Sequence, residues 1–278
     1  MSRVLTTLLM LALVIALNAC GGAPAAAPAN APAPTSAPTT ADLHVFAAAS
    51  LTDAFAEIGK NFEAVNPGAK VSFNFAGSQQ LAQQIGQGAP ADVFASANKK
   101  QIDLMIKSGQ VISGTERIFV RNHLVVIFPK DNPAGLKDLK DLAKPGLKLV
   151  LAAKEVPVGG YALDFLAKAA KLPEYTAAYS PTVLSNVVSY EENVKSVLSK
   201  VALGEADAGI VYTSDIALDS GKVGRIDIPD NLNTIATYPI APIKDSPQAD
   251  LAQRFVDYVL SAPAQQILVK YGFIGADD

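Results

Sequence analysis

Residues 43–75, LHVFAAASLTDAFAEIGKNFEAVNPGAKVSFNF, decide the fold class of this protein. The apolar run Leu43–Ala47 predicts a strand. Apolar residues then recur at spacings of three and four, which is typical of an amphipathic helix, and Asn66-Pro67-Gly68 ends that helix. Alternating apolar and polar residues over 71–75 predict a second, half-buried strand. Strands that alternate with helices of these lengths indicate a parallel sheet covered by helices.

The same alternation continues through the rest of the chain. Two extended runs, Ile118–Phe128 and Ile235–Ile243, are long enough to cross from one folded body to another. We therefore predict an α/β protein of two lobes, each a mostly parallel sheet covered by helices, joined by two crossing strands with a cleft between them. The first lobe is predicted to comprise residues 42–122 and 239–278, and the second residues 123–238. The remaining predicted elements are helices at 78–86, 102–106, 136–142, 160–170, 191–203, 251–260 and 264–270, and strands at 92–95, 148–152 and 208–212.

The first 41 residues are predicted to direct export and to tether the folded body. Arg3 precedes the apolar run Val4–Leu17, a pattern typical of an export signal that is too short to span a bilayer comfortably. The tetrapeptide Leu17-Asn18-Ala19-Cys20 resembles the lipobox of bacterial lipoproteins, so residues 1–20 are predicted to be a lipoprotein signal peptide with lipid attachment at Cys20. Residues 21–41 contain nine Ala and five Pro with no charged or aromatic side chain, and are predicted to be a disordered linker.

Composition excludes several classes of function. The 278 residues carry 26 acidic and 23 basic side chains, and this net charge of −3 argues against a nucleic-acid partner. A single cysteine excludes an internal disulfide. The two histidines, His44 and His123, lie far apart in the sequence and leave little from which to build a zinc site or a Ser–His–Asp hydrolase. We therefore expect no enzyme active site, no cofactor and no direct cation site.

Small or polar residues mark the points at which strands give way to helices. Ser50 stands at one such junction, with Asp53 three residues later at capping-box spacing, and Ser78 stands at the next. Segments 156–160 and 191–194 lead into two further helices. Each helix start presents backbone N–H groups without helical partners, so several of them around one cleft would bind an anion without Lys or Arg. Serine is also an ordinary N-cap residue, so these positions alone leave open whether they bind a ligand or only cap helices.

Seven short motifs resemble, in order, those of the molybdate-binding proteins of ABC transporters. The motifs are VFAAASL at 45–51, GS at 77–78, LAQQI at 81–85, GAPADVF at 88–94, VPVG at 156–159, ENVK at 192–195 and GIVYTSD at 209–215. The resemblance implies the two-lobed periplasmic binding protein fold of the type with two hinge strands (type II).

The resemblance also implies five ligand contacts. In the first lobe, Ser50 and Ser78 are expected to donate through hydroxyl and backbone N–H groups. In the second lobe, Val158 and Val194 are expected to donate through backbone N–H groups, and Tyr212 through its hydroxyl. All five positions offer donors and none is a carboxylate, which suits molybdate or tungstate because these dianions offer acceptors only.

The implied function is that of an exported lipoprotein on the outer face of the cytoplasmic membrane. Such a protein is expected to act as a monomer that captures molybdate or tungstate and delivers it to an ABC permease. Two alternatives stay open at this point. One is a binding protein for another oxyanion such as sulfate, and the other is an enzyme or a signalling module on the same two-lobed fold.

Overall fold

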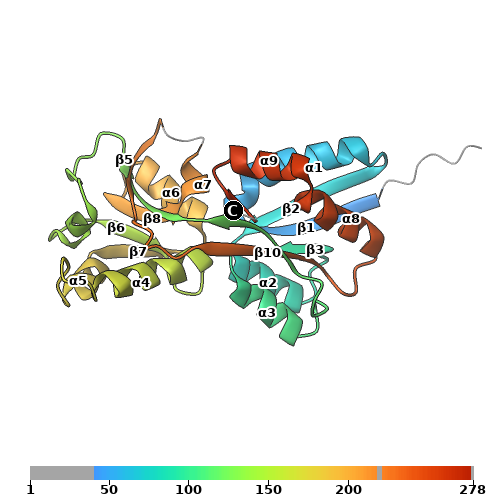
Figure 1. Ribbon diagram of the computed structural model, residues 1–278, viewed down its shortest axis with the longest axis horizontal. Coiled ribbons are helices and arrows are strands. Elements are labelled where there is room, and N and C mark those ends of the chain that lie inside the picture. Colours follow the sequence, from blue (N-terminus) through green and yellow to red (C-terminus); the bar gives the residue numbers. More distant parts are fainter. Residues whose placement is uncertain (1–40, 218–220, 277–278) are drawn as a thin grey trace, which may run out of the picture. The chain divides into compact units, whose positions relative to one another are not determined.

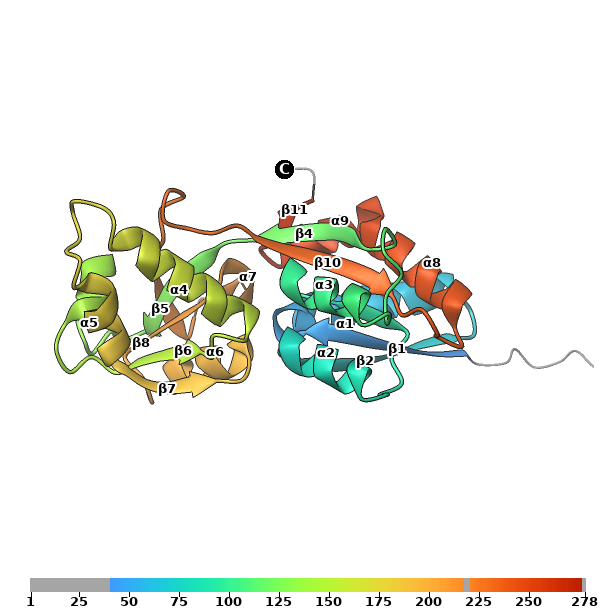
Figure 2. The ribbon, with the colours of Figure 1, turned by 90° about the horizontal axis from the view of Figure 1, so that it is seen from below.

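The computed structural model describes residues 41–217 and 221–276. These residues form two mixed sheets with helices on both faces of each (Figures 1 and 2). The predicted signal peptide, Cys20 and all of the predicted linker except Ala41 lie outside the described residues. No helix in the described part of the chain combines the length and the apolar character needed to cross a membrane.

The first lobe is built on a six-stranded sheet with the order β11-β4-β10-β3-β1-β2. Helices α1, α8 and α9 lie on one side of this sheet, and α2 and α3 lie on the other (Figure 1). Its strands are β1 (Ala41–Ala48), β2 (Ala69–Ala76), β3 (Val93–Ala95), β4 (Arg117–Asn122), β10 (Ala236–Pro242) and β11 (Ile274–Gly275). Its helices are the 3-10 helix η1 (Ala49–Leu51), α1 (Thr52–Val65), α2 (Ser78–Gly86), α3 (Lys99–Lys107), α8 (Ala249–Leu260) and α9 (Ala262–Lys270).

The second lobe is built on a five-stranded sheet with the order β7-β6-β8-β5-β9. Helices α4 and α5 lie on one side of it, and α6 and α7 on the other (Figure 1). Its strands are β5 (Leu124–Pro129), β6 (Leu149–Ala152), β7 (Val187–Glu191), β8 (Ala208–Tyr212) and β9 (Val223–Asp227). Its helices are the 3-10 helix η2 (Leu139–Ala143), α4 (Pro157–Ala169), α5 (Tyr179–Ser185), α6 (Val194–Ala202) and α7 (Thr213–Ile216).

The two sheets are mixed, whereas the sequence predicts mostly parallel ones. Strands β1, β2 and β3 pair in parallel, as do β6, β7 and β8, because each pair is joined through helices. Strand β10 pairs antiparallel with β3 and β4, and β5 pairs antiparallel with β8 and β9. The reason is geometric, since a chain that leaves the first lobe along β4 must return to it in the opposite direction along β10.

The predicted crossing segments differ in detail from the observed ones. The run 118–128 divides into β4 and β5, and the chain changes sheet between Asn122 and Leu124. On the return, Ala236 already pairs with Asn122, so the predicted lobe boundary between residues 238 and 239 falls inside β10. Ala41 belongs to β1 and pairs with Ala69, because the edge of the sheet extends to this residue.

Two predicted helices are also shorter or tighter than expected. The segment 136–142 contains only the 3-10 helix η2, which Asp138 begins by accepting the Lys140 N–H at 2.8 Å. The predicted helix 191–203 begins at Val194, because residues up to Glu191 extend strand β7 alongside β6.

Aromatic packing fixes helix α1 on the first sheet. Phe55 lies at the centre, with its ring centroid 5.7 Å from that of Phe119 on β4 and 6.1 Å from that of Phe255 on α8. Two turns further along the helix, Phe62 meets Phe255 edge to face at 5.2 Å. Aromatic pairs of this kind contribute about 0.5–1.5 kcal/mol beyond the burial of their area. They pack α1 against β4 and α8, and so place its start, next to residues 49–51, at the end of β1.

Candidate functional site

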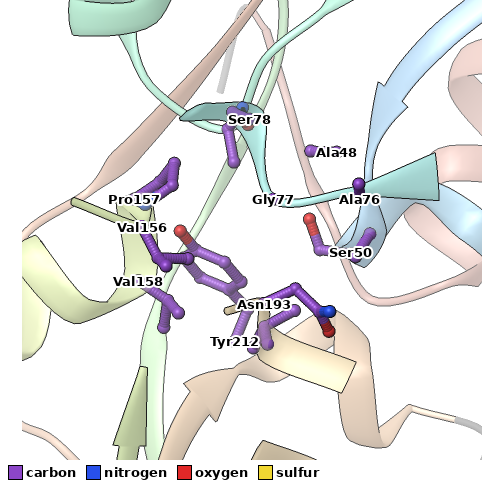
Figure 3. A pocket seen from close by; sticks show the side chains of 13 residues that line it. Ala48, Ser50, Ala76, Gly77, Ser78, Val156, Pro157, Val158, Asn193 and Tyr212 are labelled. Carbon is purple, nitrogen blue, oxygen red and sulfur yellow. Dashed lines mark hydrogen bonds between the residues drawn. The ribbon is translucent and has the colours of Figure 1, made fainter. Parts of the chain in front are cut away.

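All five predicted site residues line one pocket. The pocket is walled by residues of both lobes, and the centre of a water-sized sphere can move within about 10 Å³ of it. This volume corresponds to about one water molecule, so the pocket suits only a small ligand. Figure 3 shows the side chains of Ser50, Ser78 and Tyr212 around the same space. The complete lining is Ala48, Ala49, Ser50, Ala76, Gly77, Ser78, Ala97, Val156, Pro157, Val158, Asn193, Val194 and Tyr212.

Ser50 does not cap a helix, although the sequence suggests that it does. It lies inside η1, and α1 begins two residues later at Thr52, whose hydroxyl donates to the Ala49 carbonyl at 2.7 Å. The capping box with Asp53 is therefore not formed, because the extra 3-10 turn shifts the helix start. The Ser50 hydroxyl instead lies 3.0 Å from the Tyr238 hydroxyl, and the residue is buried.

Ser78 is the first residue of α2, and the residue that precedes the helix is Gly77. The Gly77 N–H donates to the side chain of Gln80 at 3.2 Å. The Ser78 hydroxyl oxygen accepts the Ala97 N–H at 3.0 Å. Because this bond occupies an acceptor position, the hydroxyl proton of Ser78 is left for another partner, and the residue is available as a donor.

The start of α4 brings a backbone donor to the pocket from the second lobe. Pro157 occupies the first position of the helix, where its missing N–H is not needed, and Val158 follows with an N–H that has no acceptor inside the helix. The absence of a side chain at Gly159 lets the first turn of α4 lie close to the backbone that follows β6. A Cβ atom at this position would lie 2.1 Å from the Ala153 carbonyl oxygen and 2.4 Å from that of Ala152.

Helix α6 provides the other backbone donor. The Asn193 side chain accepts the Ser196 N–H at 3.0 Å and so caps the helix. The N–H of Val194, the first helical residue, has no acceptor within the helix and lies at the pocket.

Tyr212 brings a buried hydroxyl group to the pocket. It ends β8, is 1% exposed, and its hydroxyl has no hydrogen-bond partner among the described residues. Burial raises the pKa of Tyr212 well above its ordinary value, so the hydroxyl keeps its proton at neutral pH. A buried donor without a partner costs about 1–3 kcal/mol. A ligand that offers an acceptor would recover this free energy.

The pocket lining carries no charged side chain. None of the thirteen lining residues has a carboxylate, ammonium, guanidinium or imidazole group. Across the described residues there is no cluster of three or more His, Cys, Asp or Glu side chains that could hold a metal ion. The donors are hydroxyl groups and the starts of helices, whose partial positive charge favours an anion.

Polar contacts join the two lobes beside the pocket. The Gln80 amide donates to the Glu192 carboxylate at 2.9 Å, and the Gln79 amide donates to the Glu192 carbonyl at 3.0 Å. Lys195 pairs with Asp53 at 2.8 Å. These contacts hold both walls of the pocket together in this conformation.

Sequence reasoning missed several residues of the site. Asn193 and Gly77 stand within the quoted motifs, next to predicted contacts, and the motifs could have pointed to them. Tyr238 and Asn122, which lie behind Ser50, belong to the crossing strands and gave no sequence signal beyond an extended apolar run.

The sequence is similar to those of known solute-binding proteins over nearly the whole folded part of the chain. The family described as "Bacterial extracellular solute-binding protein" matches residues 43–274. The molybdate-binding protein ModA of Mycobacterium tuberculosis is 40% identical over 229 residues, which cover 82% of this chain and 83% of that protein. The ModA protein of Escherichia coli is 32% identical over 237 residues, covering 82% of this chain and 87% of that protein.

Solved structures of related proteins have the same fold as this chain. The substrate-binding domain of a putative molybdenum ABC transporter from Clostridium difficile is 31% identical and superposes with a TM-score of 0.63, over 84% of this chain and 99% of that one. The periplasmic molybdate-binding protein of Azotobacter vinelandii shares the fold with a TM-score of 0.71 at 22% identity, over 84% of this chain and 98% of that one. With two linked α/β lobes, and with these relatives along nearly the whole folded body, the chain belongs to the bacterial extracellular solute-binding proteins.

Proposed function

We propose that this protein captures molybdate or tungstate between its two lobes and delivers the ion to an ABC permease. The observation that carries the proposal is the Tyr212 hydroxyl, which is buried in the pocket and has no hydrogen-bond partner within residues 41–217 and 221–276. Together with the donors at Ser50, Ser78, Val158 and Val194, it presents hydrogen atoms to the ligand from both lobes. The names of the ModA relatives support the choice of ligand.

The donor set favours an oxyanion without a proton. Molybdate and tungstate are tetrahedral dianions that only accept hydrogen bonds, whereas hydrogen phosphate must also donate one. The lining offers no carboxylate to receive that proton. Binding should therefore discriminate between ions of similar size by their state of protonation.

The affinity can be judged from the number of donors. Hydrogen bonds to a charged group contribute about 1.5–3 kcal/mol each, so five give about 8–15 kcal/mol before association costs of about 4–15 kcal/mol. A submicromolar dissociation constant needs about −8 kcal/mol. It is reached only when the lobes close and exclude water, which strengthens every one of these bonds.

Sulfate is the second candidate, because it too is a dianion without a proton. One solved neighbour, the sulfate-binding protein SubI of Mycobacterium tuberculosis, shares the fold with a TM-score of 0.75 at 18% identity, over 85% of this chain and 87% of that one. The pocket chemistry described above accommodates either ion, so the two candidates differ only in the size of the ion that fits best.

The proposal includes the cellular setting. Residues 1–20 direct export, Cys20 carries the lipid anchor, and residues 21–40 tether the body to the outer face of the cytoplasmic membrane. Residues 41–122 with 236–276 make up one of the two lobes that close on the ion, residues 124–217 with 221–227 make up the other, and the protein acts as a monomer. It serves as a carrier and not as a catalyst, since Tyr212 is the only titratable side chain in the pocket lining.

Isothermal titration calorimetry of the purified protein with molybdate, tungstate, sulfate and phosphate tests the ligand. We expect submicromolar binding of molybdate and tungstate, weaker binding of sulfate and no measurable binding of phosphate. Failure to bind any of the dianions, or equal affinity for phosphate, would overturn the proposal. Membrane fractionation of cells that express Cys20→Ser tests the anchor, because this variant should leave the membrane fraction with its ligand affinity unchanged.

A further inference from the structure

Two fully buried polar side chains stand behind Ser50 without touching the pocket. Tyr238 lies on β10 and Asn122 ends β4, so both belong to the strands through which the chain crosses between the lobes. Neither residue lines the pocket, and both are 0% exposed. Their hydrogen bonds determine what the Ser50 hydroxyl can do.

The amide of Asn122 has one possible orientation. Its oxygen faces the backbone N–H of His123 at 3.0 Å, and this group can only donate. The same oxygen accepts from the Thr213 hydroxyl at 2.9 Å. The nitrogen must therefore face the opposite side, where it donates to the Ser214 hydroxyl at 2.8 Å and to the Tyr238 hydroxyl at 3.4 Å.

This orientation decides the direction of the next hydrogen bond. The Tyr238 oxygen receives a proton from Asn122, and its own proton needs an acceptor. Ser50 Oγ, 3.0 Å away, is the acceptor that the described residues provide. If Ser50 donated to Tyr238 instead, the Tyr238 proton would be buried without a partner, which is unfavourable. The chain of donors therefore runs from Asn122 to Tyr238 to Ser50.

We propose that Asn122 and Tyr238 are positioning residues that hold the Ser50 hydroxyl as a hydrogen-bond donor to the bound oxyanion. This inference rests on the proposed function. Tyr238 occupies a lone pair of Ser50 Oγ, so the Ser50 proton points away from Tyr238 and is left for the ligand. The occupied lone pair also makes Ser50 a poorer acceptor for a protonated ion.

The same amide connects the donors of the two lobes. Thr213 and Ser214, which bind Asn122, follow directly after Tyr212 at the start of α7. Asn122 thus fixes the backbone next to one pocket donor and, through Tyr238, the hydroxyl of another. Both connections pass through the crossing strands, where the two lobes are joined.

A double-mutant cycle tests the proposal by calorimetry with molybdate. Tyr238→Phe removes one oxygen and keeps the ring packed against Phe119 and Phe273, so we expect it to fold. It should weaken molybdate binding about 5- to 20-fold in the wild-type background. In the Ser50→Ala background it should change the affinity less than twofold, because the group through which it acts is gone.

Three controls separate the possible outcomes. Tyr179→Phe removes another buried tyrosine hydroxyl, one that donates to the Leu139 carbonyl in the second lobe, and should leave molybdate affinity unchanged. An equal effect of Tyr238→Phe with and without Ser50, or no effect on affinity, would overturn the proposal. Wild-type protein that fails to bind molybdate would instead refute the proposed function, and thermal unfolding of each variant verifies that it is folded.

Discussion

Lys195 Nζ lies 2.8 Å from Asp53 Oδ2, and this ion pair joins α6 of the second lobe to α1 of the first. The Asp53 side chain is more exposed than that of Lys195, so solvent screens the pair. Its location matters more than its strength, since it joins helices of the two lobes beside the pocket.

Asp53→Lys should therefore weaken molybdate binding about two- to fivefold, because like charges then oppose closure. If the added positive charge acted mainly by attracting the anion, the variant would instead bind molybdate more tightly. The matched control is Glu57→Lys, which makes the same charge change one turn along α1 and breaks a pair with Lys270 inside the first lobe. Calorimetry at two salt concentrations measures both. Tighter binding by Asp53→Lys would show that the pair does not stabilise the closed state.

Tyr212→Phe should stabilise the ligand-free protein against unfolding and weaken its binding of molybdate. The hydroxyl has no partner in the described structure, so its removal should raise the free energy of unfolding by about 1–2 kcal/mol. Loss of a donor to the dianion should reduce affinity about 10- to 100-fold. Urea denaturation without ligand and calorimetry with molybdate measure the two effects. A variant that loses stability and keeps its affinity would contradict this role of Tyr212.

Gly159→Ala should damage both the fold and the site, because the new methyl group would clash with the carbonyl oxygens of Ala152, the last residue of β6, and of Ala153, which follows it. We expect a loss of about 1–3 kcal/mol in the free energy of unfolding, together with weaker molybdate binding as Val158 shifts. Gly160→Ala is the matched control, since its Cβ would lie 3.6 Å from the Lys154 carbonyl oxygen in ordinary contact. If both variants showed the same stability in thermal unfolding and the same molybdate affinity in calorimetry, the predicted clash at Gly159 would be refuted.

Asp215 should make the empty protein less stable as the pH rises. Burial raises the pKa of Asp215 from 3.8 to about 6, and one carboxylate oxygen has no hydrogen-bond partner among the described residues. Between these values the folded state holds a proton that the unfolded state has lost. Stability therefore falls as the pH increases from about 4 to 6, and the loss is complete above the folded pKa.

Asp215→Asn should remove this dependence. Relative to wild type, the variant should gain up to about 3 kcal/mol between pH 4 and pH 7, because a carboxyl group that titrates in both states is replaced by an amide that does not. Chemical denaturation of both proteins at four pH values measures the difference. A constant difference across this range would show that the Asp215 carboxyl group titrates normally.

The sequence was most informative at the ends of strands. Ser78, Val158 and Val194 stand where local patterns change from strand to helix, and such junctions are visible in the order of residue types alone. At Ser50 only the predicted capping box with Asp53 is wrong, because a single 3-10 turn shifts the helix start, and no residue pattern indicates that turn. The predicted fold class was confirmed by the comparisons. The antiparallel pairing could not be predicted from hydrophobic periodicity, because it depends on which strands cross between the lobes.

Asn122 and Tyr238 show why the rest of the site could not be predicted. They are separated by 116 positions and lie in runs that indicate only extended chain. Their contact with each other, and with Ser50, arises from the pairing of β4 with β10, which is a property of the assembled sheet. The direction of the hydrogen bond from Tyr238 to Ser50 is harder still to predict, because it depends on all the partners of the Asn122 amide together.

The uncharged lining of the pocket has a consequence for the protein as a whole. Binding of a dianion adds two negative charges to a protein unless a group in the site takes up a proton at the same time. None of the thirteen lining residues titrates near neutral pH, so uptake of a dianion makes a protein of formal charge −3 more negative by two units. Empty and loaded molecules should therefore migrate as separate bands in native electrophoresis at neutral pH, which would let occupancy be followed without a label.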